Sequence, residues 1–316
     1  MVGPGGKESM AGIIESVPNV SEGRRRDIIE AIAEAFGAPA GTELLDVSSD
    51  PSHNRTVLTA IGDAKALEES SLHLFEASVS RIDLRSHHGQ HPRMGAVDVL
   101  PFVPLHGVTM AECIRLARRV AERVASRFDL PVFLYGDAAQ QKGRSDLALI
   151  RKGQFEGLAA KLKAPFWKPD FGPARPHPSA GASAIGARKV LIAFNVELAT
   201  DRIEIAKAIA KSVRASSGGL PGVKALGFYL ADRQHAQVSM NLTDYRTTSM
   251  LKVFERIGSE AERLGTQVLG SQIVGLVPRD ALPKDPVHSL KLLDFDEDKV
   301  LEVNVKRKLG VESPFD

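Results

Sequence analysis

The stretch APFWKPDFGPARPHPSAGASAIGA, residues 164–187, interrupts an otherwise regular alternation of predicted strands and helices. It holds five prolines, which fix φ and lack a backbone N–H group, together with glycines, which allow positive φ. Such a stretch predicts a loop or linker, and we place a boundary between two subdomains there. The simpler alternative is a plain connector, but loops of this length in compact chains often bind ligands.

The segments on the two sides of this stretch repeat one order of elements. Hydrophobic spacing predicts strand, helix, strand, strand, helix, strand over residues 12–84, then a further strand, helix, strand and short helix over residues 95–163. The six-element order returns over residues 189–277, and residues 282–316 are predicted to form a helix and a short strand. The order βαββαβ is the split βαβ, or ferredoxin-like, motif.

We therefore predict an α/β protein, built as an α+β sandwich of two ferredoxin-like subdomains. The predicted division is a flexible tail at 1–11, an N-terminal subdomain at 12–180 and a C-terminal subdomain at 181–316.

Composition narrows the class of protein. The chain has 316 residues, of which 43% are hydrophobic and 25% charged, and this excludes a wholly disordered chain. Its formal net charge of +2 gives no reason to expect nucleic acid as a partner. The single cysteine, Cys113, excludes an internal disulfide, and its amphipathic surroundings predict a buried helix residue. No apolar run approaches the ~20 residues of a membrane span, so we expect a cytoplasmic protein without a membrane partner.

The densest polar cluster is RIDLRSHHGQHPRMG, residues 81–95, which holds three of the nine histidines. Histidine suits proton transfer or metal ligation, because its ordinary pKa lies near neutrality. His87 and His91 have the spacing of a helical zinc site, but Gly89 and Pro92 argue against a helix there. A catalytic loop is favoured over a metal site and over a solvated loop without chemistry.

Other motifs carry less information. Arg55 follows a polar loop and could hold a carboxylate in a bidentate manner, although a surface turn is equally compatible. The DFG triplet at 170–172 lacks the other kinase motifs, and the glycines at 216–222 are weak support for an anion site. Neither a GxGxxG nor a Walker A pattern is present, so nucleotide cofactors have no support.

A series of motifs resembles one known family, the glutamate formimidoyltransferases, which form the formiminotransferase part of formiminotransferase–cyclodeaminase. The resemblance runs from about residue 12 to about residue 312, and its most specific part surrounds His91. In chain order the motifs are ESVPNVSEG (15–23), LLDV (44–47), NRTV (54–57), HGQHPRMGA (88–96) with Asp98, LYG (134–136), WKPDFGP (167–173), GARK (186–189), IAFN (192–195), AQVSMNL (236–242) and GSQIVGLVP (270–278).

The resemblance implies a transferase that moves the formimino group of N-formimino-L-glutamate to N5 of tetrahydrofolate, in histidine breakdown and one-carbon metabolism. It also implies a homodimer with a substrate tunnel between two α/β subdomains. The catalytic histidine of the family corresponds to His91. Its folate-binding stretch maps onto Gly172, Pro173, Ala174, Arg175, Pro176, His177, Pro178, Ser179, Ala180 and Gly181.

This chain departs from the family pattern in that stretch. Residues 174–180 are polar or small where the animal enzymes are more apolar and carry an aromatic residue. We also expect ammonia release from the product to need a separate enzyme, since the sequence shows no cyclodeaminase part.

The implied chemistry suggests further roles. His91 would act in turn as general base and general acid, with Asp98 orienting it. Asp46 and Asp98 are candidates to face the cationic amidine, and Arg55 and Arg93 to bind substrate carboxylates. Tetrahydrofolate, which can carry a polyglutamate tail, is expected as co-substrate, and no metal is expected.

Two alternatives from other classes stay open at this point. One is a folate-binding protein without transfer activity. The other is a metal-dependent hydrolase of formimino or formyl amino acids that uses His87, His88 and His91.

Overall fold

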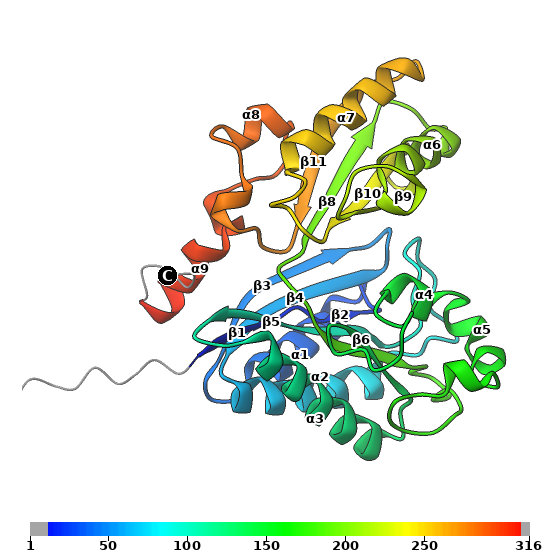
Figure 1. The fold of residues 1–316 in the computed structure, drawn as a ribbon, viewed down its shortest axis with the longest axis vertical. Coiled ribbons are helices and arrows are strands. Elements are labelled where there is room, and N and C mark those ends of the chain that lie inside the picture. The colour runs from blue at the N-terminus through cyan, green and yellow to red at the C-terminus, as the bar shows by residue number, and fades with distance from the viewer. Residues whose placement is uncertain (1–11, 311–316) are drawn as a thin grey trace, which may run out of the picture.

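The computed structural model describes residues 12–310 and contains two β-sheets, each covered by helices on one face (Figure 1). The predicted flexible tail at 1–11 lies outside the described residues. The first sheet has seven strands, which are β1 (Ile13–Ser16), β2 (Asn19–Val20), β3 (Thr42–Asp50), β4 (Arg55–Gly62), β5 (Val97–His106), β6 (Val132–Gly136) and β7 (Ser183–Ala187).

In the first sheet, β1 and β2 act as one interrupted strand between β4 and β5. Both pair antiparallel with β4 and with β5, and Pro18, which cannot donate to a ladder, stands at the break. β3 pairs with β4 at one edge, while β7 runs parallel between β5 and β6 at the other. The strand order is therefore β3-β4-β1/β2-β5-β7-β6.

Three helices cover one face of this sheet: α1 (Arg26–Gly37), α2 (Ala64–Arg81) and α3 (Met110–Phe128). α3 begins at a capping box in which Thr109 and Glu112 satisfy each other's backbone N–H groups. Its apolar side, which includes Cys113, packs into the core against β5 and β7. Burial raises the pKa of the Cys113 thiol to about 12, so the prediction of a buried cysteine is confirmed.

The strand predicted at residues 81–84 is wrong. Arg81 ends α2, and Ile82 and Leu84 are buried in the turn that follows rather than in a ladder. The strand that completes the first βαββαβ order is β5. The polar loop before Arg55 is short, because β3 continues to Asp50 and forms a hairpin with β4.

The second sheet has four antiparallel strands in the order β11-β8-β10-β9, and two helices cover one face of it. These elements follow the predicted βαββαβ order, which confirms a mixed α/β architecture with two sheets. They are β8 (Ile192–Leu198), α6 (Ile203–Val213), β9 (Val223–Leu230), β10 (His235–Leu242), α7 (Met250–Arg263) and β11 (Val268–Val274).

After β11 come two further helices, α8 (Pro286–Leu290) and α9 (Leu301–Leu309). Within residues 275–310 the backbone makes only isolated bridges, at Leu292 and Val300, so the short strand expected there is not found in that range. In the described part of the chain, no helix combines the length and the apolar character needed to cross a bilayer.

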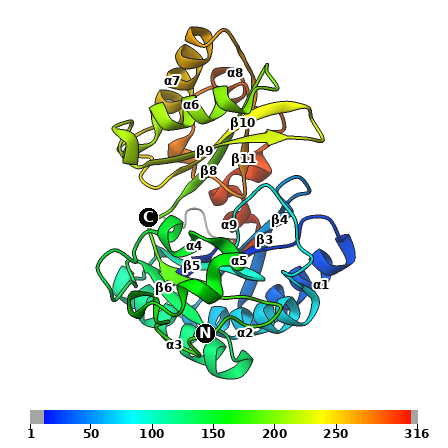
Figure 2. The ribbon, with the colours of Figure 1, turned by 90° about the vertical axis from the view of Figure 1, so that its right-hand side faces the viewer.

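The face of each sheet opposite α1–α3, or opposite α6 and α7, lies toward the other sheet (Figures 1 and 2). On the first sheet, α4 (Leu147–Arg151) and α5 (Gln154–Lys161) cover the β6 side through Ile150 and Leu158. The β1 and β4 side is covered by Leu276 and by α9. A strip of the sheet between these two apolar clusters faces the second half of the chain.

Only part of the Pro- and Gly-rich stretch at residues 164–187 is a connection outside the sheets. Its last residues form β7 of the first sheet, and residues 188–191 lead into β8 of the second. The division into subdomains at 12–180 and 181–316 stays a prediction.

Gly95 allows a close approach that positions the histidine-rich loop. Its backbone bridges Gly181, and a Cβ on Gly95 would lie far inside van der Waals contact with the Ala182 carbonyl oxygen. Gly181 itself has a φ of +70°, which few residues other than glycine adopt.

We expect Gly95→Ala to lower the free energy of unfolding by about 1–3 kcal/mol or more, because the clash involves backbone that cannot move aside. Gly258→Ala is a matched control, since Gly258 lies inside α7 with open space around its Cα, and it should stabilise by about 1 kcal/mol. Urea denaturation of both variants tests this, and equal effects would contradict the packing argument.

Candidate active site

A small pocket opens where the histidine-rich loop meets β2 and the start of β4. The pocket is narrow and only partly enclosed. The pocket brings together four of the predicted site residues, His91, Asp98, Arg55 and Arg93. The full lining is Val20, Ser21, His53, Asn54, Arg55, His87, His91, Arg93 and Asp98.

Hydrogen bonds to backbone carbonyl groups hold two loops together at this pocket. The loop after β3 accepts a bond from the Gln90 N–H through the Ser52 carbonyl, at 3.1 Å. Asn54 donates its side-chain amide to the His88 carbonyl at 3.0 Å, and its own carbonyl accepts from His87 Nε2 at 2.9 Å. Asn54 has a φ of +49°, a conformation that asparagine tolerates better than most residues. These contacts place Arg55 beside His91.

His91 is held as a neutral base. Its Nδ1 lies 2.8 Å from the Pro92 carbonyl oxygen, which can only accept, so we assign the proton to Nδ1 and the free lone pair to Nε2. Burial lowers the pKa of His91 well below its ordinary value, and the nearby Arg55 and Arg151 guanidinium groups lower it further. An uncharged imidazole with a free Nε2 can accept a proton.

Asp98 binds a backbone N–H group and an arginine side chain. Its Oδ1 accepts from the Met94 N–H at 2.7 Å, which fixes the turn after His91. A guanidinium nitrogen of Arg151 lies 2.6 Å from Asp98 Oδ2. Among residues 12–310 no hydrogen bond joins Asp98 to His91, so any effect on the imidazole passes through the turn and through Arg151.

Arg55 keeps a free donor beside the pocket. It donates to the Asn19 side-chain oxygen, while its buried Nε has no partner within the described residues. Burial lowers the pKa of Arg55 to about 10, and the charge of Arg151 contributes, so the guanidinium stays positive at neutral pH. This is the arrangement expected for binding a carboxylate.

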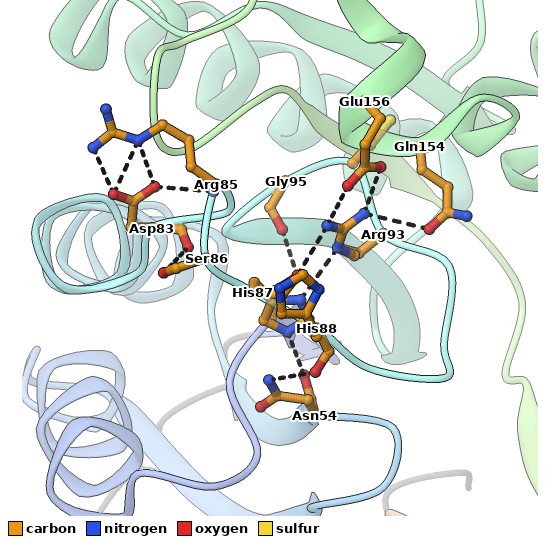
Figure 3. A network of polar contacts seen from close by, with 12 residues as sticks. Asn54, Asp83, Arg85, Ser86, His87, His88, Arg93, Gly95, Gln154 and Glu156 are labelled. Carbon is orange, nitrogen blue, oxygen red and sulfur yellow. Dashed lines mark hydrogen bonds and ion pairs between the residues drawn. The ribbon is translucent and has the colours of Figure 1, made fainter.

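Arg93 is engaged with the protein itself (Figure 3). Its two terminal nitrogens lie 2.7 and 2.8 Å from the carboxylate oxygens of Glu156, and its Nε donates to His87 Nδ1 at 3.2 Å. A further bond reaches the His87 carbonyl. In this structure Arg93 connects the loop to α5 through His87 and Glu156, and the carboxylate-binding role suggested for Arg93 stays a prediction.

Two predicted sets lie outside the pocket. Asp46, on β3, accepts from Ser48 at 2.7 Å, and Lys299 lies 3.7 Å from its carboxylate. None of the ten residues from Gly172 to Gly181 lines the pocket. That segment is tied to the end of α3 by the ion pair of Arg175 with Asp129, and to the loop after α2 by the Leu84 N–H, which donates to the Ser179 carbonyl.

Sequence reasoning missed the residues that the second half contributes. Phe228 on β9 packs edge-on against the His53 ring at a centroid distance of 5.0 Å, and lies 6.5 Å from the His91 ring. Gln237 on β10 places Oε1 3.4 Å from His53 Nε2. The AQVS motif around Gln237 pointed to this segment, but nothing in the sequence indicated that Gln237 contacts His53.

His53 itself is 5% exposed, and its Nδ1 has no partner within residues 12–310. Burial lowers the pKa of His53, so two neutral imidazoles, with centroids 5.9 Å apart, stand in one pocket.

No group of three or more His, Cys, Asp or Glu side chains in the described part of the chain is arranged to hold a metal ion. His88 is exposed, while His87 is bonded on both ring nitrogens.

Two facing sheets, with an uncharged histidine and an unsatisfied arginine between them, define a candidate acid–base site for an anionic substrate. The formiminotransferase N-terminal subdomain model matches residues 13–188, and the formiminotransferase domain model matches residues 193–315. The chain belongs to the formiminotransferase family.

Among curated relatives, the chain is 45% identical over 295 residues to glutamate formimidoyltransferase of Streptococcus pyogenes serotype M1, covering 93% of this chain and 99% of that protein. It is 45% identical over 302 residues to the Thermoplasma acidophilum protein of the same name, covering 95% and 99%. It is 46% identical over 279 residues to formimidoyltransferase-cyclodeaminase of Sus scrofa, covering 86% of this chain and 51% of that protein.

The lowered pKa of His91 predicts a pH effect on stability. The unfolded chain binds a proton at His91 near pH 6.5, whereas the folded chain does so only at lower pH, so stability falls as pH drops below about 6.5. His91→Gln should remove this contribution. Between pH 7 and pH 5 the unfolding free energy of the variant should therefore fall by up to about 2 kcal/mol less than that of the wild type. Denaturation at both pH values measures it. Parallel curves for wild type and variant would contradict a neutral buried His91.

Proposed function

We propose that this chain transfers the formimino group of N-formimino-L-glutamate to N5 of tetrahydrofolate, giving 5-formimino-tetrahydrofolate and L-glutamate. The observation that carries the proposal is His91, a neutral base with a free Nε2 inside the HPRMG motif and next to the cationic Arg55. The names of relatives that match 93% and 95% of the chain support it.

The reaction needs one group that first takes and then gives a proton. N5 of tetrahydrofolate attacks the amidine carbon, a C–N bond forms, and the positive N5 loses its proton to His91 Nε2. The tetrahedral intermediate then breaks its bond to the glutamate nitrogen, which receives that proton from His91 as it leaves. A histidine that is neutral before the attack can accept the proton at once.

The charged residues serve binding and position. Arg55, with its free Nε, binds a carboxylate of the donor substrate. Asp98 and Arg93 hold the His91 loop through Met94 and His87. Asp46 stays a candidate for the cationic amidine, and Gly172–Gly181 a candidate folate-binding segment.

We further propose that the protein is a cytoplasmic homodimer, accepts polyglutamylated folate and works with a separate deaminase, as the family resemblance suggests. The mass in solution and product analysis with purified deaminase test these points.

His91→Ala should lower kcat by about 10²–10⁴-fold, because proton transfer of this kind contributes that much. The Kd for tetrahydrofolate should stay nearly unchanged. His73→Ala, on the exposed side of α2, is the matched control and should keep full activity. Activity of His91→Ala within a few-fold of wild type would refute the assignment.

The substrate assignment is tested by glutamate release from N-formimino-L-glutamate with and without tetrahydrofolate. We expect release only with tetrahydrofolate, and an unchanged rate after dialysis against EDTA. Release without folate that EDTA abolishes would favour the metal-dependent hydrolase. Folate binding without any release would favour a binding protein.

A further inference from the structure

The short helix α4 carries the arginine that pairs with Asp98 beside the His91 pocket. A guanidinium nitrogen of Arg151 lies 2.6 Å from Asp98 Oδ2, and the two side chains are 12% and 4% exposed. α4 has five residues, and a helix of that length is not stable by itself, because nucleation costs more than one turn returns. Contacts with neighbouring elements therefore decide where Arg151 stands.

The Arg151 side chain depends on its backbone for its position. It holds Asp98 at the end of a long side chain, and its buried Nε has no hydrogen-bond partner within residues 12–310. Asp98 is anchored separately, since its Oδ1 accepts from the Met94 N–H at 2.7 Å. A shift in the last turn of α4 would therefore draw the guanidinium away from Asp98 and would leave Asp98 in place.

Lys161, the last residue of α5, closes the C-terminal end of α4. Its Nζ lies 2.8 Å from the Leu149 carbonyl oxygen, 2.5 Å from that of Ile150 and 2.9 Å from that of Lys152. An ammonium group has three N–H donors, so this one turn can use all of them. A cation is favoured there, because the last carbonyl groups of a helix lack partners and carry partial negative charge. These carbonyls lie on both sides of Arg151 in the chain.

An aromatic ring encloses the Lys161 ammonium group from a further side. Its Nζ lies 3.8 Å from the centroid of the Trp167 ring, within the range of a cation–π contact. Trp167 packs edge-on against the buried Phe133 ring of β6, with centroids 6.3 Å apart, so the aromatic partner is itself anchored. Burial lowers the pKa of Lys161 to about 8, and the charge of Lys152 contributes, so the group is mainly protonated at neutral pH.

Two other contacts of α4 do not fix its last turn. Ile150 packs in an apolar cluster with Leu158, and such a contact holds the helix on the sheet without a directional preference. At the other end of α4, Lys224 lies 2.6 Å from Asp146, but these side chains are 49% and 41% exposed, and exposed ion pairs contribute little. Lys161 is the directional contact at the end that carries Arg151.

We infer that Lys161 is a positioning residue, which holds the last turn of α4 so that the Arg151 guanidinium stays on Asp98 beside the His91 pocket. α5 then supports the histidine-rich loop from both of its ends, since Glu156 near its start pairs with Arg93. The effect on turnover rests on the proposed function, whereas the effect on the His91 ring does not.

Arg151 is one of several groups that set the proton affinity of His91. Burial lowers the pKa of His91 most, the charges of Arg55, Arg151 and His53 lower it further, and the Pro92 carbonyl opposes them. The other titratable groups that line the pocket are His87, Arg93 and Asp98. Withdrawal of Arg151 removes one cationic neighbour, so the pKa of His91 should rise toward its ordinary value without reaching it.

Lys161→Met keeps a long side chain and removes the ammonium group. In an NMR titration of the His91 ring, assigned with His91→Gln, the midpoint should rise by about 0.5–1 pH unit above that of the wild type. Lys161→Arg keeps the charge and should raise it less. Lys163→Met, which is exposed and two residues further on, is the matched control and should not change it. An unchanged midpoint in Lys161→Met would show the inference to be wrong.

Lys161→Gln carries the same test if Lys161→Met does not fold, because its amide keeps two N–H donors for the carbonyls of α4. Its midpoint should lie between those of the wild type and Arg151→Gln. A midpoint equal to that of the wild type would count against the inference in the same way.

A double-mutant cycle separates positioning from a general loss of structure. Arg151→Gln should raise the His91 midpoint at least as much as Lys161→Met does. Adding Lys161→Met to Arg151→Gln should then raise it no further, because the residue through which Lys161 acts is already gone. Additive shifts would mean that Lys161 acts by another route, and would overturn the inference.

Turnover gives a readout that also tests the proposed function. The acidic limb of the kcat profile for glutamate release should move up with the NMR midpoint. At pH values below that midpoint, kcat of Lys161→Met should be about 3- to 10-fold lower than that of the wild type, which is the same shift expressed as a ratio. A protein that shows the NMR shifts but never releases glutamate would overturn the proposed function and support the inference.

Discussion

Polar side chains enclosed between two facing sheets are the constraint on which the rest of this structure depends. A buried charge is costly unless it is paired, and Asp98 with Arg151 and Arg93 with Glu156 are such pairs. Burial, together with the charges of Arg55 and Arg151, lowers the pKa of His91 and keeps its imidazole neutral. The enclosure of these polar side chains thus gives an uncharged base with positively charged neighbours. Such surroundings suit a substrate that carries carboxylates.

Backbone groups, rather than apolar packing, hold the loops that carry this chemistry. The Asn54 amide and carbonyl join the hairpin loop after β3 to the histidine-rich loop. The close approach of Gly95 to Gly181 joins that loop to the Pro- and Gly-rich segment. Each of these contacts ends on a backbone group, so the two loops keep a defined position relative to each other.

The second half of the chain packs against residues of the pocket. Phe228 and Gln237 contact His53 from the opposing sheet, whose helix-free face they share with the buried Glu197. The first half holds the base and the cationic groups, while the second half supplies the aromatic ring and the amide that lie against His53. A site built across two sheets therefore depends on how the sheets sit relative to each other.

The sequence by itself determined the two βαββαβ orders and the buried Cys113, and it selected His91 as the residue for the proposed catalytic role, because periodicity, turn residues and a long motif are local properties. It misplaced a strand at residues 81–84, since a short apolar pattern does not distinguish a buried turn from a ladder. Only the tertiary structure decided that Arg93 pairs with Glu156 and that Phe228 lies beside His53 and His91. Such partners lie far apart in the chain, and their contact is set by the packing of sheets and helices, which no local pattern encodes.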